Sequence, residues 1–156
     1  MTQEDKKLLL NDLSARLPYG VIGEYSWKGN KPHNRELTGN LYDELNSSWS
    51  SSEDSKFIPY LRPMSSMTEE EKKNLLVTIV GDDGIKYFQV LSDGSIDNTD
   101  ATIQDLNKFN MHWVNFDKDT VTLYLDWLNA HHFDYRGLIE KGLAIEITKE
   151  NNPYKE

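Results

Sequence analysis

The sequence contains no cysteine, and this absence excludes several kinds of site at once. A chain without thiols forms no disulfide scaffold, holds no zinc through thiolates and offers no cysteine nucleophile. Long apolar runs are also missing, because the run from Leu75 to Val80 is too short to span a bilayer. The first residues, Met1 to Asn11, carry acids where a signal peptide carries bases. We therefore expect a cytoplasmic protein with no membrane partner.

Motifs that bind phosphates or activate nucleophiles are missing as well. The sequence has no Gly-x-Ser-x-Gly elbow and no glycine-rich GxxxxGK[ST] or GxGxxG loop. It also lacks the HExxH spacing that places two metal ligands on one face of a helix. These absences predict a protein that is not an enzyme, with no catalytic residues, no cofactor and no metal.

Aromatic residues supply much of the apolar side-chain area that this chain can bury in a core. Its hydrophobic fraction is only 37%, but it has four Trp, eight Tyr and five Phe in 156 residues. Large aromatic side chains bury enough area for a core in a chain of this length. We expect one domain over residues 1–147, with sub-lobes at 18–63 and 68–147, and a frayed tail at 148–156.

Acidic residues outnumber basic ones, and the formal net charge is −9. This charge repels nucleic acid at long range, so direct nucleic-acid binding is not expected. Six aspartates lie between Asp82 and Asp105 against Lys86 alone. They indicate either an acidic binding face or two ordinary turns, at residues 82–84 and 92–95, in which aspartate bonds its own backbone.

Hydrophobic periodicity predicts helices and strands in an irregular order. Expected helices are 2–17, 68–74, 101–109, one opening at Asp119 or Thr120, and a short one from Asp134 to Gly142. Expected strands are 21–27, 35–42, 56–60 (an edge strand because of Pro59), 75–80, 85–91, 95–96, 111–116 and 143–147, with a polar loop at 46–55. This order predicts an α+β fold with a mostly antiparallel sheet and flanking helices. Residues 20–61 are expected to form an SH3-like small barrel or an open curled sheet.

Two helix starts carry a local capping signal. Thr2 precedes Asp5, and Thr68 precedes Glu71, each at the spacing of a capping box. In such a box the hydroxyl accepts from the amide three residues on, while the acid accepts from the threonine amide. Both helices should therefore begin at these threonines.

Two adjacent histidines, His131 and His132, are the best material for chemistry. Neighbours on a helix point about 100° apart and do not readily share a metal. One interpretation is that both histidines pack and hydrogen-bond at a helix end. The alternative is a small enzyme that uses His131 and His132 with Asp126 or Asp134.

The segment from Pro59 to Met64 combines two prolines with residues that are frequent at interfaces. Tyr60, Arg62 and Met64 are candidate interaction residues, because Tyr and Arg often dominate binding energies. They also suit an anchor that packs the crossover between a sheet and a helix. Trp49, within the polar stretch 46–55, is the fourth candidate interaction residue.

Three blocks of the sequence carry a resemblance to a known group of proteins. They are RLPYGVI at 16–22, PYLRPMSSMTEEEK at 59–72 and LNAHHFDYRGLIEKGLA at 128–144, roughly a quarter of the chain. These blocks resemble an uncharacterised family associated with gut Bacteroides genomes, their phages and mobile elements. The resemblance implies a small intracellular accessory protein and assigns no activity, cofactor or catalytic residue.

We expect a non-enzymatic protein-interaction or accessory protein of a phage or mobile element. Its protein partner is unknown, and self-association is left open. One alternative is an acidic inhibitor or nucleic-acid mimic that acts on a host or defence factor, because the chain is strongly acidic. The other alternative is the small enzyme built on His131 and His132.

Overall fold

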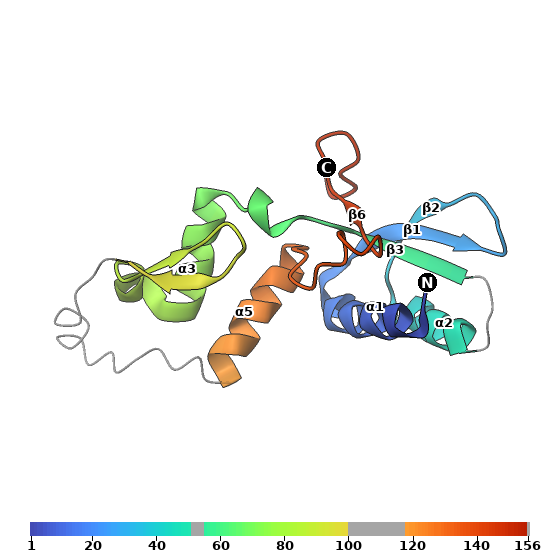
Figure 1. Ribbon diagram of the computed structural model, residues 1–156, viewed down its shortest axis with the longest axis horizontal. Coiled ribbons are helices and arrows are strands. Elements are labelled where there is room, and N and C mark those ends of the chain that lie inside the picture. The colour runs from blue at the N-terminus through green and yellow to red at the C-terminus, as the bar shows by residue number, and fades with distance from the viewer. Residues whose placement is uncertain (51–54, 100–117, 156) are drawn as a thin grey trace. The chain divides into compact units, whose positions relative to one another are not determined.

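The computed structural model describes residues 1–50, 55–99 and 118–155 (Figure 1). It combines helices with a mostly antiparallel mixed sheet, which confirms the predicted α+β class. Contacts divide the chain into two compact units, which we call unit 1 (Met1–Pro63 with Asn129–Glu156) and unit 2 (Met64–Leu128). The C-terminal segment, Asn129–Glu156, thus belongs to the same unit as the N-terminal residues.

Unit 1 begins with helix α1 (Gln3–Arg16), and its capping box is confirmed. The Thr2 hydroxyl accepts from the Asp5 amide at 3.1 Å, and the Asp5 carboxylate accepts from the Thr2 amide at 2.8 Å. A short 3-10 turn, Leu17–Tyr19, follows α1 and ends at Gly20, whose φ is 63°. The first turn of α1 is therefore fixed in place by its own sequence.

Helix α2 (Gly39–Ser50) occupies most of the strand predicted at 35–42, which is confirmed only at Arg35 and Glu36. It also occupies residues 46–50 of the predicted loop at 46–55, so the loop prediction was wrong there. The Thr38 hydroxyl accepts from the Leu41 amide at 3.3 Å and so caps this helix. Leu41, Leu45 and Trp49 are buried. Their spacing of four residues places them on one helical face, although polar residues separate them in sequence.

The sheet of unit 1 has the order β2-β1-β3-β6. Its strands are β1 (Ile22–Trp27), β2 (His33–Glu36), β3 (Ser55–Leu61) and β6 (Ile145–Glu146). Strand β1 pairs antiparallel with β2 and β3, whereas β6 pairs parallel with β3. The sheet is open rather than closed, so an SH3-like barrel does not form.

The prediction of an edge strand at 56–60, based on Pro59, was wrong, because β3 lies between β1 and β6. The β6 ladder, however, pairs only with Tyr60 and Leu61. On that side of the strand Pro59 therefore has no ladder partner, which is compatible with its missing N–H.

Helices α1 and α2 lie on the same side of the unit 1 sheet (Figure 1). The hydrophobic core of unit 1 fills the layer between these helices and the sheet. Its buried members come from α1, α2, β1, β3, the C-terminal segment and two residues directly outside strands, Val21 before β1 and Leu37 after β2. They are Leu9, Leu13, Val21, Tyr25, Leu37, Leu41, Leu45, Trp49, Phe57, Leu61, Leu138, Leu143 and Ala144. Among the helices in the described ranges, none combines the length and apolarity of a membrane span.

Unit 2 opens with a 3-10 turn, Met64–Ser66, and helix α3 (Glu69–Gly84). The Thr68–Glu71 capping box is confirmed. The strand predicted at 75–80 is wrong, because the helix continues through this run and breaks at Gly81 (φ 73°, ψ 173°). Leu75 and Leu76 are buried, so the apolar run packs on a helical face instead of pairing as a strand.

A hairpin follows, formed by β4 (Phe88–Val90) and β5 (Ile96–Asn98). Its turn was predicted at residues 92–95, and there Asp93 accepts from the Ser95 amide at 2.9 Å. Helix α5 (Lys118–Ala130) begins close to the predicted Asp119 start. The predicted helix 101–109 and strand 111–116 lie outside the described residues.

The C-terminal segment is built from turns. Asp134 does not cap a helix as predicted, but its carboxylate accepts from the Leu138 and Ile139 amides at 2.9 and 2.8 Å. Gly142 ends these turns with φ 67°. Residues 148–155, expected to fray, place the Tyr154 hydroxyl against the sheet, where it accepts from the Ile22 amide at 2.8 Å.

Candidate functional site

The two histidines lie in a turn directly after α5. His132 has a left-handed φ of 59°, and its ring stacks on Tyr154 with centroids 3.9 Å apart. Burial, and after it the charges of Arg16, His131 and Arg62, lower the pKa of His132 to about 4. Its imidazole is therefore neutral at neutral pH. Within the described residues, no three His, Asp or Glu side chains gather as metal ligands.

A buried ion pair lies beside this turn. Arg16 Nε is 2.6 Å from Asp12 Oδ2, and both side chains have an exposed fraction of 0%. Arg16 also donates to the main-chain oxygen of Phe133 at 2.8 Å, and Arg136 Nε lies 3.3 Å from Asp12 Oδ1. These contacts join α1 to the C-terminal segment and give the cluster a structural role.

Two of the predicted interaction residues, Tyr60 and Arg62, anchor the end of β3. The Tyr60 side chain is 6% exposed, and its hydroxyl donates to Glu24 Oε1 at 3.0 Å. Desolvation and then Glu24 raise the pKa of Tyr60. The Arg62 guanidinium lies 4.2 Å from the Phe133 ring centroid, and its amide donates to the His132 oxygen at 2.8 Å.

The other two predicted interaction residues occupy different places. Trp49 is 3% exposed, and its indole N–H donates to the Ser55 oxygen at 2.7 Å in the core of unit 1. Met64 belongs to unit 2, and its side chain packs closely against Gly94. A Cβ added to Gly94 would lie only 1.9 Å from the Met64 Cε. Trp49 and Tyr60 are therefore largely withdrawn from solvent.

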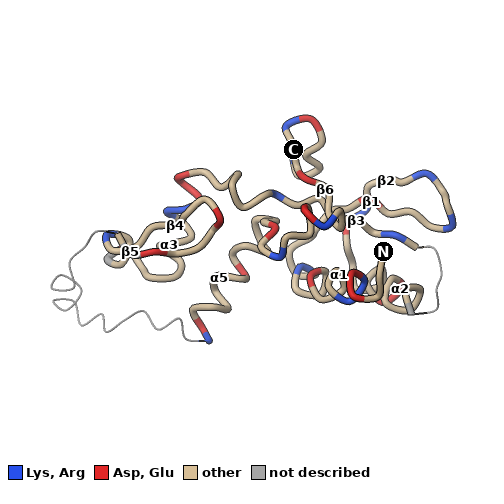
Figure 2. The backbone as a smooth tube through the Cα atoms, in the orientation of Figure 1, with Lys and Arg blue, Asp and Glu red and all other residues tan. Residues whose placement is uncertain are grey.

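The hairpin of residues 27–36 presents an exposed basic surface that the sequence did not predict, although strands on both sides of its turn were expected. Trp27 is 43% exposed, and the Lys28 amine lies 4.6 Å from its ring centroid. Lys31 and Arg35 are also exposed, and Figure 2 shows basic residues in blue along this hairpin. A signal for it did exist, because residues 25–35 contain three cationic residues and no acid.

Strand β2 forms an open edge of the sheet, and all four of its residues are exposed. The amide of Leu37, directly after β2, donates to the residue directly before β1 at 2.8 Å. Antiparallel bonding alternates, so His33 and Arg35 bond to β1. The main-chain N–H and C=O groups of Asn34 and Glu36 therefore face outward. We call these groups the β2 edge.

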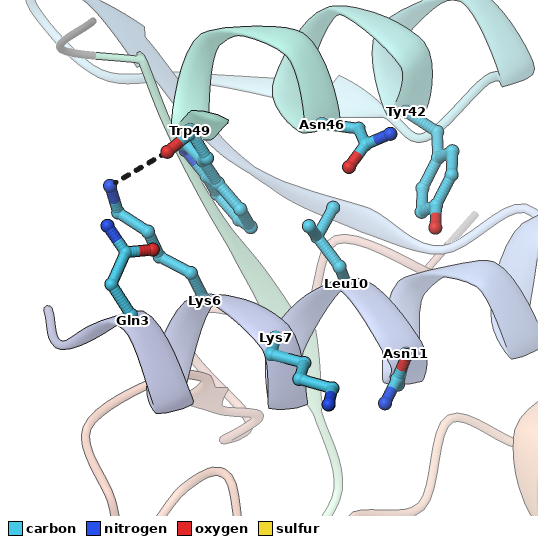
Figure 3. Close-up of a pocket in the computed structure, with 8 residues that line it drawn as sticks. All are labelled: Gln3, Lys6, Lys7, Leu10, Asn11, Tyr42, Asn46 and Trp49. Atoms are coloured by element: carbon cyan, nitrogen blue, oxygen red, sulfur yellow. Dashed lines mark hydrogen bonds between the residues drawn. The ribbon is translucent and has the colours of Figure 1, made fainter. Parts of the chain in front are cut away.

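A groove of about 290 Å³ lies between α1 and α2 (Figure 3). Lys6 reaches across it, and its amine donates to the Trp49 main-chain oxygen at 3.2 Å. The groove is lined by Gln3, Lys6, Lys7, Leu10, Asn11, Tyr42, Asn46 and Trp49. These lining residues include two cations and no acid. We call this feature the α1–α2 groove.

The β2 edge offers outward main-chain groups on a hairpin with three cations and one acid, Glu36, and the α1–α2 groove offers polar side chains with two cations. No protein-family model, no curated protein and no solved structure matches this chain. The chemistry of these two features is therefore the basis on which a function is assigned.

Proposed function

We propose that this chain is a non-enzymatic protein-interaction protein that binds an extended, acidic segment of a partner along the β2 edge. The observation that carries the proposal is the outward-facing main chain of Asn34 and Glu36 on an exposed edge strand. An extended peptide that adds a strand here gains main-chain hydrogen bonds, which supply affinity with little dependence on sequence.

Charge selects the kind of strand that pairs with this edge. Lys28, Lys31 and Arg35 are exposed along the hairpin. Arg35 lies on β2 and Lys28 and Lys31 lie in the adjacent loop, against one acid on β2, Glu36. This excess of positive charge opposes pairing with a second copy of the same edge, since like charges across a pair are destabilising. The same cations attract carboxylates, so an acidic segment is favoured over self-association at this edge.

The exposed indole of Trp27 adds a surface for apolar or aromatic side chains of the bound segment. Exposed Trp and Arg residues are frequent contributors to binding energy. Trp27 is the first residue of a tight hairpin turn in which Lys28 and Gly29 both have positive φ (50° and 77°). The Asn30 amide donates to the Trp27 oxygen at 3.0 Å and closes this turn, which fixes the backbone that carries the indole.

Nucleic acid is a weaker candidate for this surface. A phosphate backbone has no N–H and C=O groups to continue the ladder of the β2 edge. The net charge of −9 also repels a polyanion at long range more strongly than it repels a short acidic peptide.

The packing of His132 supports the non-enzymatic part of the proposal. A small enzyme would need its imidazole to gain and lose a proton near neutral pH. Stacking on Tyr154 and a pKa lowered to about 4 are unsuited to that task. The resemblance to proteins of Bacteroides phages and mobile elements supports an accessory role, with a host or element protein as the partner.

A labelled peptide of alternating Glu and Val tests this proposal by fluorescence anisotropy. We expect saturable binding that weakens as salt concentration rises. Lys31→Glu is expected to weaken binding roughly tenfold through charge reversal. The matched control, Lys73→Glu, changes an exposed lysine of unit 2 and should leave binding unchanged.

Asn34→Pro separates strand pairing from simple charge attraction. Proline removes the outward N–H of Asn34 and leaves the β1 ladder bonds of its neighbours in place. We expect this variant to lose most of its peptide affinity and to keep its folding stability. Unchanged affinity in Asn34→Pro, or equal affinity for a single-stranded DNA of the same charge, would refute the proposal.

A further inference from the structure

We infer that the α1–α2 groove is a binding site for a small anionic ligand that carries a carboxylate or phosphate group. This inference does not depend on the partner proposed for the β2 edge, because the two features lie on different elements of unit 1. It rests on the framework, charge, hydrogen-bonding groups and size of the groove.

The walls of the groove belong to a fixed framework. Helices α1 and α2 share the core through Leu9, Leu13, Leu41 and Leu45, each at most 1% exposed. The capping box at Thr2 pins the first turn of α1, which carries part of the lining. Side chains on such packed helices are held in place better than those on loops.

The charge of the lining is opposite to that of the whole chain. Lys6 and Lys7 contribute two positive charges, and no Asp or Glu of the described ranges 1–50, 55–99 and 118–155 lines the groove. The chain as a whole carries a net charge of −9. Two cations in a concave site whose described lining holds no acid favour an anion, because a recess concentrates their field.

The remaining polar groups of the lining suit the oxygen atoms of such an anion. Gln3 and Asn11 carry carboxamides, and Tyr42 carries a hydroxyl, all of which can donate hydrogen bonds. The Lys6 ammonium has three donors, and the bond to the Trp49 oxygen occupies one. Charge-assisted bonds from lysine to a carboxylate or phosphate are stronger than neutral ones.

The volume of the groove limits the size of the ligand. A volume of about 290 Å³ corresponds to roughly ten molecules of liquid water. It lies at the lower end of the range for small-molecule pockets. A dicarboxylate or a small phosphate ester fits this volume, whereas a dinucleotide cofactor does not.

Nitrogen-15 NMR titrations with inorganic phosphate, succinate and neutral glucose test the inference. We expect both anions to give saturable shifts at the Trp49 indole N–H and at the main-chain amides of Lys6 and Asn46. Glucose should give none of these shifts. Shifts spread over exposed lysines elsewhere in the chain, or no saturable shift with either anion, would overturn the inference.

Lysine variants then assign the binding to the groove. Lys7 is exposed, so Lys7→Gln is not expected to disturb the fold, and it should weaken anion binding roughly tenfold. Lys73→Gln, an exposed lysine on α3, is the matched control and should leave the anion affinity unchanged. Equal affinities in both variants would contradict the inference.

A last comparison separates the free ligand from an acidic side chain of a protein partner. The alternating Glu and Val peptide should leave the Trp49 indole signal unmoved, because its carboxylates bind at the β2 edge. Asn34→Pro should leave the anion affinity unchanged. An indole shift caused by the peptide, with none from phosphate or succinate, would overturn the assignment to a small ligand.

Discussion

The ring of His132 stacks on the ring of Tyr154, with centroids 3.9 Å apart and planes 11° from parallel. The Tyr154 hydroxyl accepts from the Ile22 amide at 2.8 Å and donates to the Tyr60 oxygen at 3.2 Å. Burial raises the pKa of Tyr154 to about 12, so this hydroxyl stays protonated. One aromatic pair therefore ties the C-terminal segment to β1 and β3.

Tyr154→Phe should lower the free energy of unfolding by about 1–2 kcal/mol, because the Ile22 amide loses its hydrogen-bond acceptor. Urea denaturation at pH 7 measures this change. Tyr135→Phe is the matched control: the buried Tyr135 hydroxyl has no hydrogen-bond partner among the residues that the structure describes, so its removal should be neutral or stabilising. Equal losses in the two variants would argue against the anchoring role of Tyr154.

His132 should make the fold less stable as the solution becomes acidic. Its pKa is about 4 in the fold, against an ordinary value of 6.5, because of burial and the charges of Arg16, His131 and Arg62. Between these two pH values the unfolded chain binds a proton that the folded chain does not. The contribution to stability is therefore full above pH 6.5 and falls as the pH drops towards 4.

Comparison with His132→Asn isolates this contribution. Asparagine tolerates the left-handed backbone at this position and binds no proton. The free energy of unfolding of the variant should depend less steeply on pH between 6.5 and 4. Parallel pH profiles for both proteins would show that His132 does not control this range.

Asp12→Ala should destabilise the fold by about 3–5 kcal/mol, because it leaves the Arg16 charge buried without its partner. The double variant Asp12→Leu with Arg16→Met removes both charges and keeps much of the volume. It should be destabilised by less than the sum of the losses in the single variants Asp12→Leu and Arg16→Met. A double-mutant cycle by chemical denaturation measures this difference, and strict additivity would contradict the coupling.

Gly23→Ala should be strongly destabilising, by about 2 kcal/mol or more, because β1 and β3 approach closely there. An added Cβ would lie 2.6 Å from the Phe57 ring and 2.7 Å from the Ile58 main-chain oxygen. Gly39→Ala is the matched control, since nothing lies within 4 Å of its added Cβ in the first turn of α2. That change should be neutral or stabilising by up to about 1 kcal/mol, as judged by thermal unfolding.

Local signals predicted local structure well in this chain. The capping boxes at Thr2 and Thr68 depend only on residues three apart, and both are present. The turn at Asp93 is equally local. A sequence pattern that fits both a helix and a strand was less informative. The four-residue spacing of Leu37 and Leu41, for example, is compatible with one face of a strand and with one face of a helix. Burial of the helical face decided in favour of α2.

The depth of a side chain was harder to predict than its secondary structure. Tyr60 and Trp49 are residue types that are frequent at interfaces, but the fold buries both side chains. The β2 edge depends on which strands pair, and the α1–α2 groove on how two helices pack around Leu10. These relationships are tertiary, so periodicity within a segment does not reveal them.

Amide hydrogen exchange at the β2 edge tests the central claim most directly. The amides of His33 and Arg35 already bond to β1 and serve as internal references. We predict that saturation with the alternating Glu and Val peptide slows exchange at Asn34 and Glu36 by at least about tenfold. Saturation by the peptide while Asn34 and Glu36 exchange as fast as in the free protein would contradict strand addition at this edge.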